Sequence, residues 1–280
     1  SKKIVWEEEK PIRWSYMKIL REFSTLKKEY PINPYAEVYQ MRDNMWAIFT
    51  ETLDGAGDPW MYLIDGPEKA MLIDTGFGCG DLKGLIKEIV GDKELIVACT
   101  HAHYDHAYGN AQYDTIYCSK AEVARMQNIN NDQIWDYLFD ETGKPKWTKF
   151  DRADLIKYSP YQIIGVEDGY KFDLGQGYEV EAVLLPGHSP GQCGYLDLHN
   201  MTLFSGDTSG ISKAKPNEPY AENCTVLASR NAFKKLQPRF KDIKGVFPGH
   251  GALDVTSSCL QYHLDACDAI LKDPENYDSC

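Results

Sequence analysis

The chain has 280 residues, with 30 Lys and Arg against 42 Asp and Glu, which gives a formal net charge of −12 with histidine neutral. Hydrophobic residues make up 43% and charged residues 26%, a composition that excludes a disordered or fibrous protein. Nucleic acids and anionic membranes are bound by surfaces rich in Lys and Arg, because these side chains replace the counterions. We therefore expect no nucleic-acid partner and no membrane partner.

The lengths of the apolar segments and the spacing of the cysteines indicate the cellular compartment of the protein. No stretch of eighteen apolar residues occurs, and the charged N-terminus lacks the apolar core of a signal peptide. The eight cysteines are dispersed without a CxxC pair, which is more typical of reduced thiols than of a disulfide framework. We expect a cytoplasmic protein.

Residues 1–44 are predicted to be an N-terminal extension of the main domain. Within them, residues 15–30 carry apolar side chains at helical spacing, and Pro31 would stop that helix. Such an extension could pack on the main domain or on a second copy of the chain. A homodimer contact is therefore one interpretation of this segment.

Residues 45–280 are predicted to form one domain in which strands and helices alternate. This order indicates an α/β fold of layered α+β type. Strands are expected at about 46–53, 60–65, 69–76, 95–100, 161–166, 178–185, 194–198, 201–207 and 244–247, and helices at about 81–90, 119–128, 131–141, 225–236 and 256–271.

Residues 119–160 are predicted to be a helical, aromatic-rich insertion in this domain. The connection that contains them is long for a plain loop. Seven aromatic residues lie between positions 135 and 161, about twice the chain average of 12%. We expect this insertion to form a lid that binds an apolar or aromatic group. The alternative is that its aromatic residues form a small satellite core or a dimer contact.

The segment 100-THAHYDHAYGN-110 contains a cluster of side chains that can bind a metal: His101, His103, Asp105 and His106. It leaves the strand predicted at 95–100, and loops after strands often carry binding residues. Imidazole and carboxylate groups suit zinc, and also iron or manganese. Four such residues within six positions are rare in a merely solvated loop, so the segment predicts a metal site.

Three later positions have the same character. His188 lies in PGHSPG, Asp207 in SGD and His250 in PGHG, and each follows a predicted strand. Glycine at these turns lets the backbone bring a side chain into a crowded centre. Each of them alone is more typical of an ordinary turn. We expect the two remaining histidines, His199 and His263, to lie in a turn and on a helix surface.

Taken together, these motifs resemble those of the metallo-beta-lactamase-fold hydrolase superfamily. The matching segments are 71-MLIDTG-76, 101-HAHYDHAYG-109, 187-GHSPG-191, 205-SGD-207 and 249-GH-250. The resemblance implies an αββα sandwich with two divalent metal ions at one edge. Zinc is the favoured metal, with iron and manganese as alternatives.

The resemblance also implies a role for each ligand. One metal would be held by His101, His103 and His188, and the other by Asp105, His106 and His250. Asp207 would bridge the two metals, and Asp74 would orient the ligand loop from behind. Two metals roughly 3.5–4 Å apart share a water and lower its pKa, which supplies a bridging hydroxide. Asp105 would accept a hydrogen bond from it and carry a proton to the leaving group.

The chain is therefore predicted to be a dinuclear metal-dependent hydrolase that acts on a carboxylic ester, lactone or thioester of a small molecule. The alternatives are a phosphodiesterase with the same centre and a mononuclear-iron oxygenase similar to the persulfide dioxygenases. His103 departs from the HxExDH pattern of flavodiiron proteins, and the complete ligand set departs from class B beta-lactamases. Only residues 251–280 follow His250, too few for the helical domain with which glyoxalase II grips glutathione.

Four aromatic residues are candidate substrate contacts: Tyr104, Tyr220, Trp135 and Trp147. The two tryptophans belong to the predicted lid. Tyr104 and Tyr220, together with Tyr108, could also stabilise an oxyanion.

Overall fold

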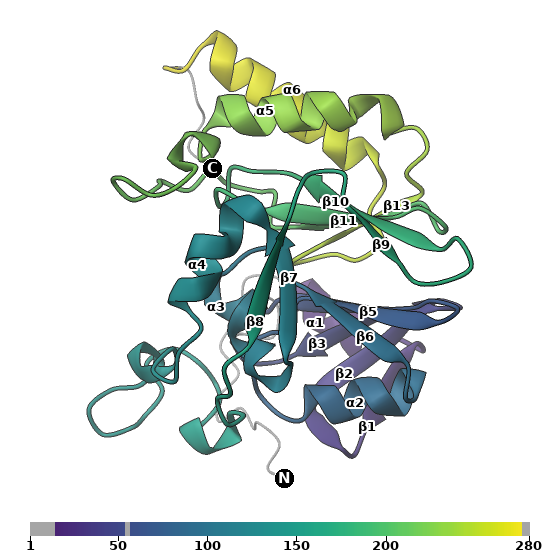
Figure 1. Cartoon of the computed structure of the whole chain (residues 1–280), viewed down its shortest axis with the longest axis vertical. Coiled ribbons are helices and arrows are strands. Elements are labelled where there is room, and N and C mark those ends of the chain that lie inside the picture. Colours follow the sequence, from purple (N-terminus) through teal and green to yellow (C-terminus); the bar gives the residue numbers. More distant parts are fainter. Residues whose placement is uncertain (1–14, 54–56, 276–280) are drawn as a thin grey trace.

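The computed structural model describes residues 15–53 and 57–275, which form two β-sheets packed face to face with helices on both outer faces (Figure 1). The strands are β1 (Lys27–Tyr30), β2 (Asn33–Arg42), β3 (Met45–Thr50), β4 (Trp60–Asp65), β5 (Lys69–Ile73), β6 (Glu94–Ala98), β7 (Thr115–Ser119), β8 (Gln162–Val166), β9 (Lys171–Asp173), β10 (Glu179–Leu184), β11 (Cys193–Asp197), β12 (Thr202–Gly206) and β13 (Gly245–Pro248). The α-helices are α1 (Ser15–Glu22), α2 (Leu82–Val90), α3 (Tyr104–Ala107), α4 (Val123–Asn128), α5 (Val226–Leu236) and α6 (Ser258–Lys272). Short 3₁₀ helices are η1 (Tyr108–Gln112), η2 (Lys120–Glu122), η3 (Asp136–Leu138), η4 (Arg152–Asp154), η5 (Ala221–Asn223) and η6 (Gln237–Arg239).

The first sheet contains β1 to β8 in chain order. Neighbouring strands from β1 to β5 are antiparallel, and those from β5 to β8 are parallel. The parallel strands are joined by crossovers such as α2, which begins where the Asp81 carboxylate accepts the N–H of Gly84 at 2.7 Å. The helix ends at Gly91, whose positive φ of 74° suits glycine.

The second sheet has the order β13-β12-β11-β10-β9. β12 and β13 are parallel, and the other neighbours are antiparallel. Helices α5 and α6 cover its outer face (Figure 1). Helix α5 begins at Thr225, whose hydroxyl accepts the N–H of Ala228 at 3.1 Å and so satisfies a helix-end donor.

Adjacent layers pack against each other through three apolar cores. The middle core, between the sheets, includes Phe49, Tyr62, Tyr195 and Phe204. A second core packs α2 and α4 on the outer face of the first sheet, and a third packs α5 and α6 on the second sheet. Because each sheet is covered on both faces, central strands such as β5 are apolar throughout their buried length. The αββα sandwich predicted from the sequence is confirmed.

The topology brings five loops to one edge of the sandwich. β5 and β6 are parallel, and so are β12 and β13. β10 runs in the same direction as β12, because each is antiparallel to β11. The loops after these five strands carry all the residues singled out as metal ligands, together with Asp74. Parallel strands therefore place residues far apart in sequence next to one another.

The N-terminal part of the chain differs from its prediction. Residues 27–42, expected to be an extension, form β1 and β2 of the first sheet, so the sheet begins before residue 45. The single helix expected over 15–30 is wrong beyond Glu22, because the chain turns at Ser24, whose hydroxyl accepts the N–H of Leu26 at 3.3 Å. Residues 1–14 lie outside the described part.

The insertion also differs, because most of it is not helical. Only α4 and the short η2, η3 and η4 occur between residues 119 and 160, and the helix expected at 131–141 is wrong. Side chains there compete with helical hydrogen bonds. The Asn131 amide oxygen accepts the N–H of Gln133 at 2.9 Å, and Asp140 accepts those of Thr142 and Lys144 at 2.8 and 3.0 Å.

Among the described helices, none has both the length and the apolar character needed to cross a membrane. The cysteines at positions 79, 99, 118, 193, 224, 259 and 267 carry free thiols.

Candidate metal centre

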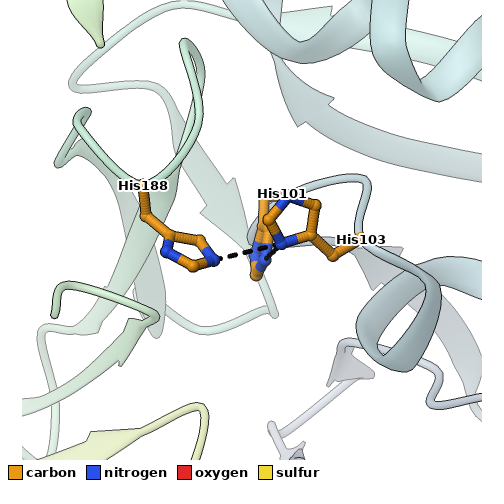
Figure 2. Close-up of side chains that lie close together, drawn as sticks. All are labelled: His101, His103 and His188. Carbon is orange, nitrogen blue, oxygen red and sulfur yellow. Dashed lines mark hydrogen bonds between the residues drawn. The ribbon is translucent and has the colours of Figure 1, made fainter. Parts of the chain in front are cut away.

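Three histidines from two loops meet at the edge of the sandwich. His101 and His103 follow β6, and His188 follows β10 (Figure 2). The Nδ1 atom of His103 lies 3.0 Å from Nε2 of His101 and 3.0 Å from Nε2 of His188. The rings point toward one another in Figure 2. The three imidazole nitrogens lie within 4.8 Å of one another, close enough to bind one metal ion together.

A second group lies beside the first. Nε2 of His106 is 3.1 Å from Nε2 of His250 and 3.6 Å from Oδ2 of Asp105. The same Asp105 oxygen lies 3.2 Å from Nε2 of His250. Asp105 and His106 belong to the short helix α3, whose first turn presents both side chains to the edge, and His250 follows β13.

Asp207 lies between the two groups. Its Oδ2 atom is 3.9 Å from His101, 3.4 Å from His188, 3.4 Å from His106 and 3.2 Å from His250, measured to Nε2. One carboxylate oxygen therefore touches members of both groups. All seven residues predicted as metal ligands are brought together.

The spacing of these atoms fits metal binding. Ligand atoms bound at 2.0–2.1 Å around a tetrahedral zinc ion are about 3.3 Å apart. The nitrogen and oxygen atoms here are separated by 3.0 to 3.9 Å. Oδ1 of Asp207 is buried and has no hydrogen-bond partner within the described ranges. A buried carboxylate oxygen without a donor is costly unless a cation offsets it, so the residues present fit a divalent metal.

Burial and the neighbouring charges set the protonation of the first group. Burial lowers the pKa of His101, His103 and His188, which for His103 falls to about 4. The positive charges that neighbouring imidazoles would carry lower these values further. At neutral pH these rings are uncharged and offer lone pairs, which is the form that binds a metal.

The second group has the opposite balance. Burial opposes charge on His106 and His250, but the carboxylates of Asp105 and Asp207 outweigh it and raise both pKa values, to about 10 for His250. The same pairing lowers the pKa of Asp105 and Asp207 despite their burial. The two carboxylates thus attract positive charge into this half of the centre.

Asp74 supports the second group from behind. Burial raises its pKa, although hydrogen bonds from its neighbours act against this. Its carboxylate lies 2.9 Å from Nδ1 of His106 and accepts the N–H and hydroxyl of Thr100 at 2.7 and 2.9 Å. Its φ of 62° is left-handed, a conformation that Asp tolerates better than most residues. The contact with Nδ1 leaves Nε2 of His106 facing the other clustered residues.

Close packing explains one glycine of the predicted motifs. A Cβ atom on Gly249 would lie 2.2 Å from Oδ1 of Asp207 and 2.9 Å from His106. Only glycine leaves room for both side chains next to His250.

The four residues predicted to contact the substrate differ in their exposure and in the side chains around them. Tyr104 lies between His103 and Asp105 in the sequence and contacts Trp147, with ring centroids 5.2 Å apart. Trp147 is 42% exposed and also faces Phe77. Trp135 is 4% exposed, and its Nε1–H donates to Phe77 O at 2.9 Å, so it belongs to a packed core and cannot meet a substrate directly.

Tyr220 is the fourth candidate. It is exposed and has a left-handed φ of 60°. In the described part of the chain, no hydrogen bond or ring contact joins its side chain to the seven clustered residues. Tyr108 is buried, with its ring 6.3 Å from that of Tyr104.

Two residues near the centre were not predicted from the sequence. Tyr137, which is 42% exposed, faces Tyr104 and Trp147 with ring centroids 6.2 and 6.4 Å away. Glu122 is fully buried and accepts hydrogen bonds from both loops of the first histidine group. No spacing in the sequence distinguishes Glu122 from a solvated glutamate at the start of a helix.

Proteins with related sequences include two kinds of named thioester hydrolase. The human protein "Acyl-coenzyme A thioesterase MBLAC2" is 27% identical over 206 residues, which cover 68% of this chain and 72% of that protein. "Hydroxyacylglutathione hydrolase GloC" from Haemophilus influenzae is 25% identical over 199 residues, covering 67% of this chain and 82% of that protein.

Solved structures share the fold. A metallo-beta-lactamase from Pontibacter korlensis superposes with a TM-score of 0.54 at 19% identity, covering 83% of this chain and 99% of that one. The MIM-2 metallo-beta-lactamase has a TM-score of 0.57 at 20% identity, covering 85% and 91%. The sequence profile of the metallo-beta-lactamase superfamily matches residues 54–250, which contain all seven clustered residues. The chain belongs to the metallo-beta-lactamase superfamily.

Proposed function

We propose that the chain is a dinuclear metal-dependent hydrolase of carboxylic thioesters, with esters and lactones as chemically related substrates. The observation that carries the proposal is the position of Asp207, whose Oδ2 atom lies within 3.2 to 3.9 Å of histidines from both groups. A carboxylate in that place can serve two metal ions at once. The relatives named as acyl-coenzyme A thioesterase and hydroxyacylglutathione hydrolase favour a thioester among the three bond types.

The donor chemistry favours zinc, with iron or manganese as alternatives. The donors are imidazole nitrogens and carboxylate oxygens, without thiolate. His103 would bind through Nδ1, and the other four histidines through Nε2, because these are the atoms that face one another. When bound, the two ions would supply an activated water and polarise the scissile carbonyl.

Asp105 is the proposed proton carrier. Its side chain is largely buried and lies beside the centre, with Oδ2 3.2 Å from His250. Its lowered pKa keeps it ionised at neutral pH, ready to accept a proton from the attacking water. It can then donate that proton to the sulfur or oxygen of the leaving group. Thiolates are good leaving groups, so a thioester needs less help from this proton than an ester does.

Three rings beside the centre are the proposed acyl site: Trp147 and Tyr137 are exposed, and Tyr104 is half-buried. Trp147, Tyr137 and Tyr104 lie within 5.2 to 6.4 Å of one another, measured between ring centroids. Tyr104 is next in sequence to His103 and Asp105, so this aromatic surface adjoins the centre. An apolar acyl chain laid on it would place its carbonyl near the ligands. This is the lid function expected for the insertion, carried by Trp147 rather than by Trp135.

The experiment is a metal analysis combined with a substrate panel. The purified chain is loaded with zinc, manganese or ferrous iron, and metal content is measured together with hydrolysis of acyl thioesters, p-nitrophenyl esters, lactones and a bis-phosphodiester. We expect about two ions per chain and the highest kcat/KM on acyl thioesters. Turnover of the phosphodiester alone would contradict the thioester assignment. One iron per chain with oxygen consumption on a persulfide would make the protein an oxygenase.

A further inference from the structure

Glu122 is a buried carboxylate outside the seven clustered residues. It ends the short helix η2 after β7, and its relative exposure is 0%. Desolvation raises its pKa, and hydrogen bonds from its neighbours oppose that rise. A buried carboxylate is unfavourable unless several donors satisfy it. The hydrogen-bond donors around Glu122 therefore indicate its structural role.

The three donors come from the two loops that carry the first histidine group. Oε1 of Glu122 accepts the backbone N–H of Ala102 at 3.0 Å, and Ala102 lies between His101 and His103. Oε2 accepts the hydroxyl of Ser189 at 2.8 Å and the N–H of Gly191 at 2.9 Å. Ser189 follows His188 directly, and Gly191 lies three positions after it in the same loop. One side chain thus joins the loop after β6 to the loop after β10.

Backbone packing requires this junction to be close. A Cβ atom on Gly191 would lie 2.3 Å from the backbone N of Glu122 and 2.7 Å from its Cβ. The loop after β10 therefore rests directly on the turn that carries Glu122. The two loops come from different sheets, and Figure 2 shows their histidines approaching from opposite sides. The position of one loop relative to the other therefore depends on the contacts that join them.

We propose that Glu122 is a positioning residue that holds the two loops at the separation needed by the site of His101, His103 and His188. It acts on the ligand geometry through Ala102 and through Ser189 and Gly191, without contact to a metal. Outer hydrogen-bond partners of ligand residues typically contribute 10–100-fold to metal affinity. The inference rests on the metal centre proposed above, and concerns only one of its two sites.

The test compares single-site metal affinities. Two backgrounds isolate the sites: His250→Ala disables the second group, and His188→Ala disables the first. Glu122→Gln is placed in each background, and zinc affinity is measured by competition with a chromophoric chelator. Gln keeps the shape but turns an N–H₂ group toward one of the three donors. We expect the affinity of the first site to fall 10–100-fold, with less than a threefold change at the second.

Asp197→Asn is the matched control for loss of a buried carboxylate. Asp197 is also 0% exposed and accepts hydrogen bonds from Tyr178 and His199, but it lies at the end of β11 that points away from the clustered residues. We expect it to lower the Tm of the metal-free chain without changing either affinity. Ser189→Ala removes one donor and leaves the carboxylate in place, so it covers the case in which Glu122→Gln does not fold. It should weaken the first site alone, by less than Glu122→Gln does.

The outcomes separate this inference from the proposed function. If the wild-type chain binds metal and neither Glu122→Gln nor Ser189→Ala changes the affinity of the first site, the inference is overturned and the proposed function is not. Equal weakening of both sites, with a loss of Tm like that of Asp197→Asn, makes Glu122 a general structural residue and also overturns it. A wild-type chain that takes up no divalent ion refutes the metal centre itself, and the inference with it.

Discussion

The Oδ2 atom of Asp207 and the Nε2 atom of His250 lie 3.2 Å apart, although 43 positions separate the two residues in the chain. The same oxygen reaches histidines of the other group. Asp207 follows β12 and His250 follows β13, and these strands are parallel neighbours. The contact therefore results directly from strand pairing, and it places one carboxylate beside both groups.

Removal of the shared carboxylate should disable both halves of the centre. We predict that Asp207→Ala lowers kcat/KM for a thioester by about a hundredfold or more and reduces metal content below one ion per chain. Asp92→Ala is the control, because its carboxylate lies on the surface in an ion pair with Lys87. Metal analysis and steady-state kinetics check the prediction. Full activity of Asp207→Ala would refute a shared ligand.

Asp74 should act mainly on the second group, because it contacts His106 directly and reaches the first group only through Thr100, whose Oγ1 lies 3.0 Å from Nδ1 of His101. Asp74→Asn keeps a residue that tolerates the left-handed φ of 62°, but loses an acceptor for either Thr100 or His106. We predict a 10–100-fold weaker second site and a smaller loss of affinity at the first site. Asp74→Ala should in addition lower stability by about 1–3 kcal/mol through backbone strain. Chelator competition and urea unfolding measure the two effects; equal weakening at both sites would contradict this role.

The pH dependence of metal uptake follows from His250. In the metal-free chain its carboxylate partners overcome burial and raise its pKa to about 10. Its proton stabilises the fold below pH 6.5, and that contribution is lost as the pH rises through about 10. A metal must displace this proton, so affinity should rise up to about tenfold per pH unit between roughly 7 and 9.

Calorimetry in buffers of different ionisation enthalpy measures this displacement. At least one proton should be released per chain at about pH 7.5. His250→Ala should bind fewer metals and release fewer protons. Uptake without proton release would mean that His250 is already neutral.

The exposed Trp147 should contribute to binding of long acyl groups. If its ring covers an acyl chain, Trp147→Ala removes apolar contact worth about 1.5 kcal/mol, or roughly a tenfold rise in KM for a long-chain thioester. An acetyl thioester should show little change. Tyr262→Ala is the control, since that ring is exposed on α6. Equal effects on both substrates would refute the acyl site.

A homodimer through the N-terminal segment stays a prediction, and α1 with the turn that follows it offers the apolar surface for it. Leu20 and Phe23 are 63% and 76% exposed, which is unusual for large apolar side chains so close together. We predict a dimer by light scattering at micromolar concentration. Phe23→Glu should shift the chain to the monomer without altering kcat, because this segment carries none of the clustered residues. A wild-type monomer at high concentration would contradict the prediction.

Much of the αββα sandwich could be predicted because its central elements have strong local patterns. β5 and β6 are apolar runs of strand length, and α2 has a capping residue at one end and glycine at the other. β1 and β2 could not be predicted because β1 (KKEY) is almost entirely polar and β2 (NPYAEVYQMR) lacks a strict alternation of polar and apolar side chains, and both lie beside a segment with helical spacing. The course of the insertion could not be predicted either, because local side-chain hydrogen bonds decide its turns.

The sequence by itself determined the ligand chemistry. The pattern of His101, His103, Asp105 and His106 is rare outside metal sites, and the later His188, Asp207 and His250 each follow a strand. Only the tertiary structure decided which atoms face one another, that Trp135 is buried while Trp147 is exposed, and that Glu122 joins two ligand loops. The physical reason is that metal ligands are set by side-chain type, whereas burial and hydrogen bonding depend on contacts between segments distant in the chain.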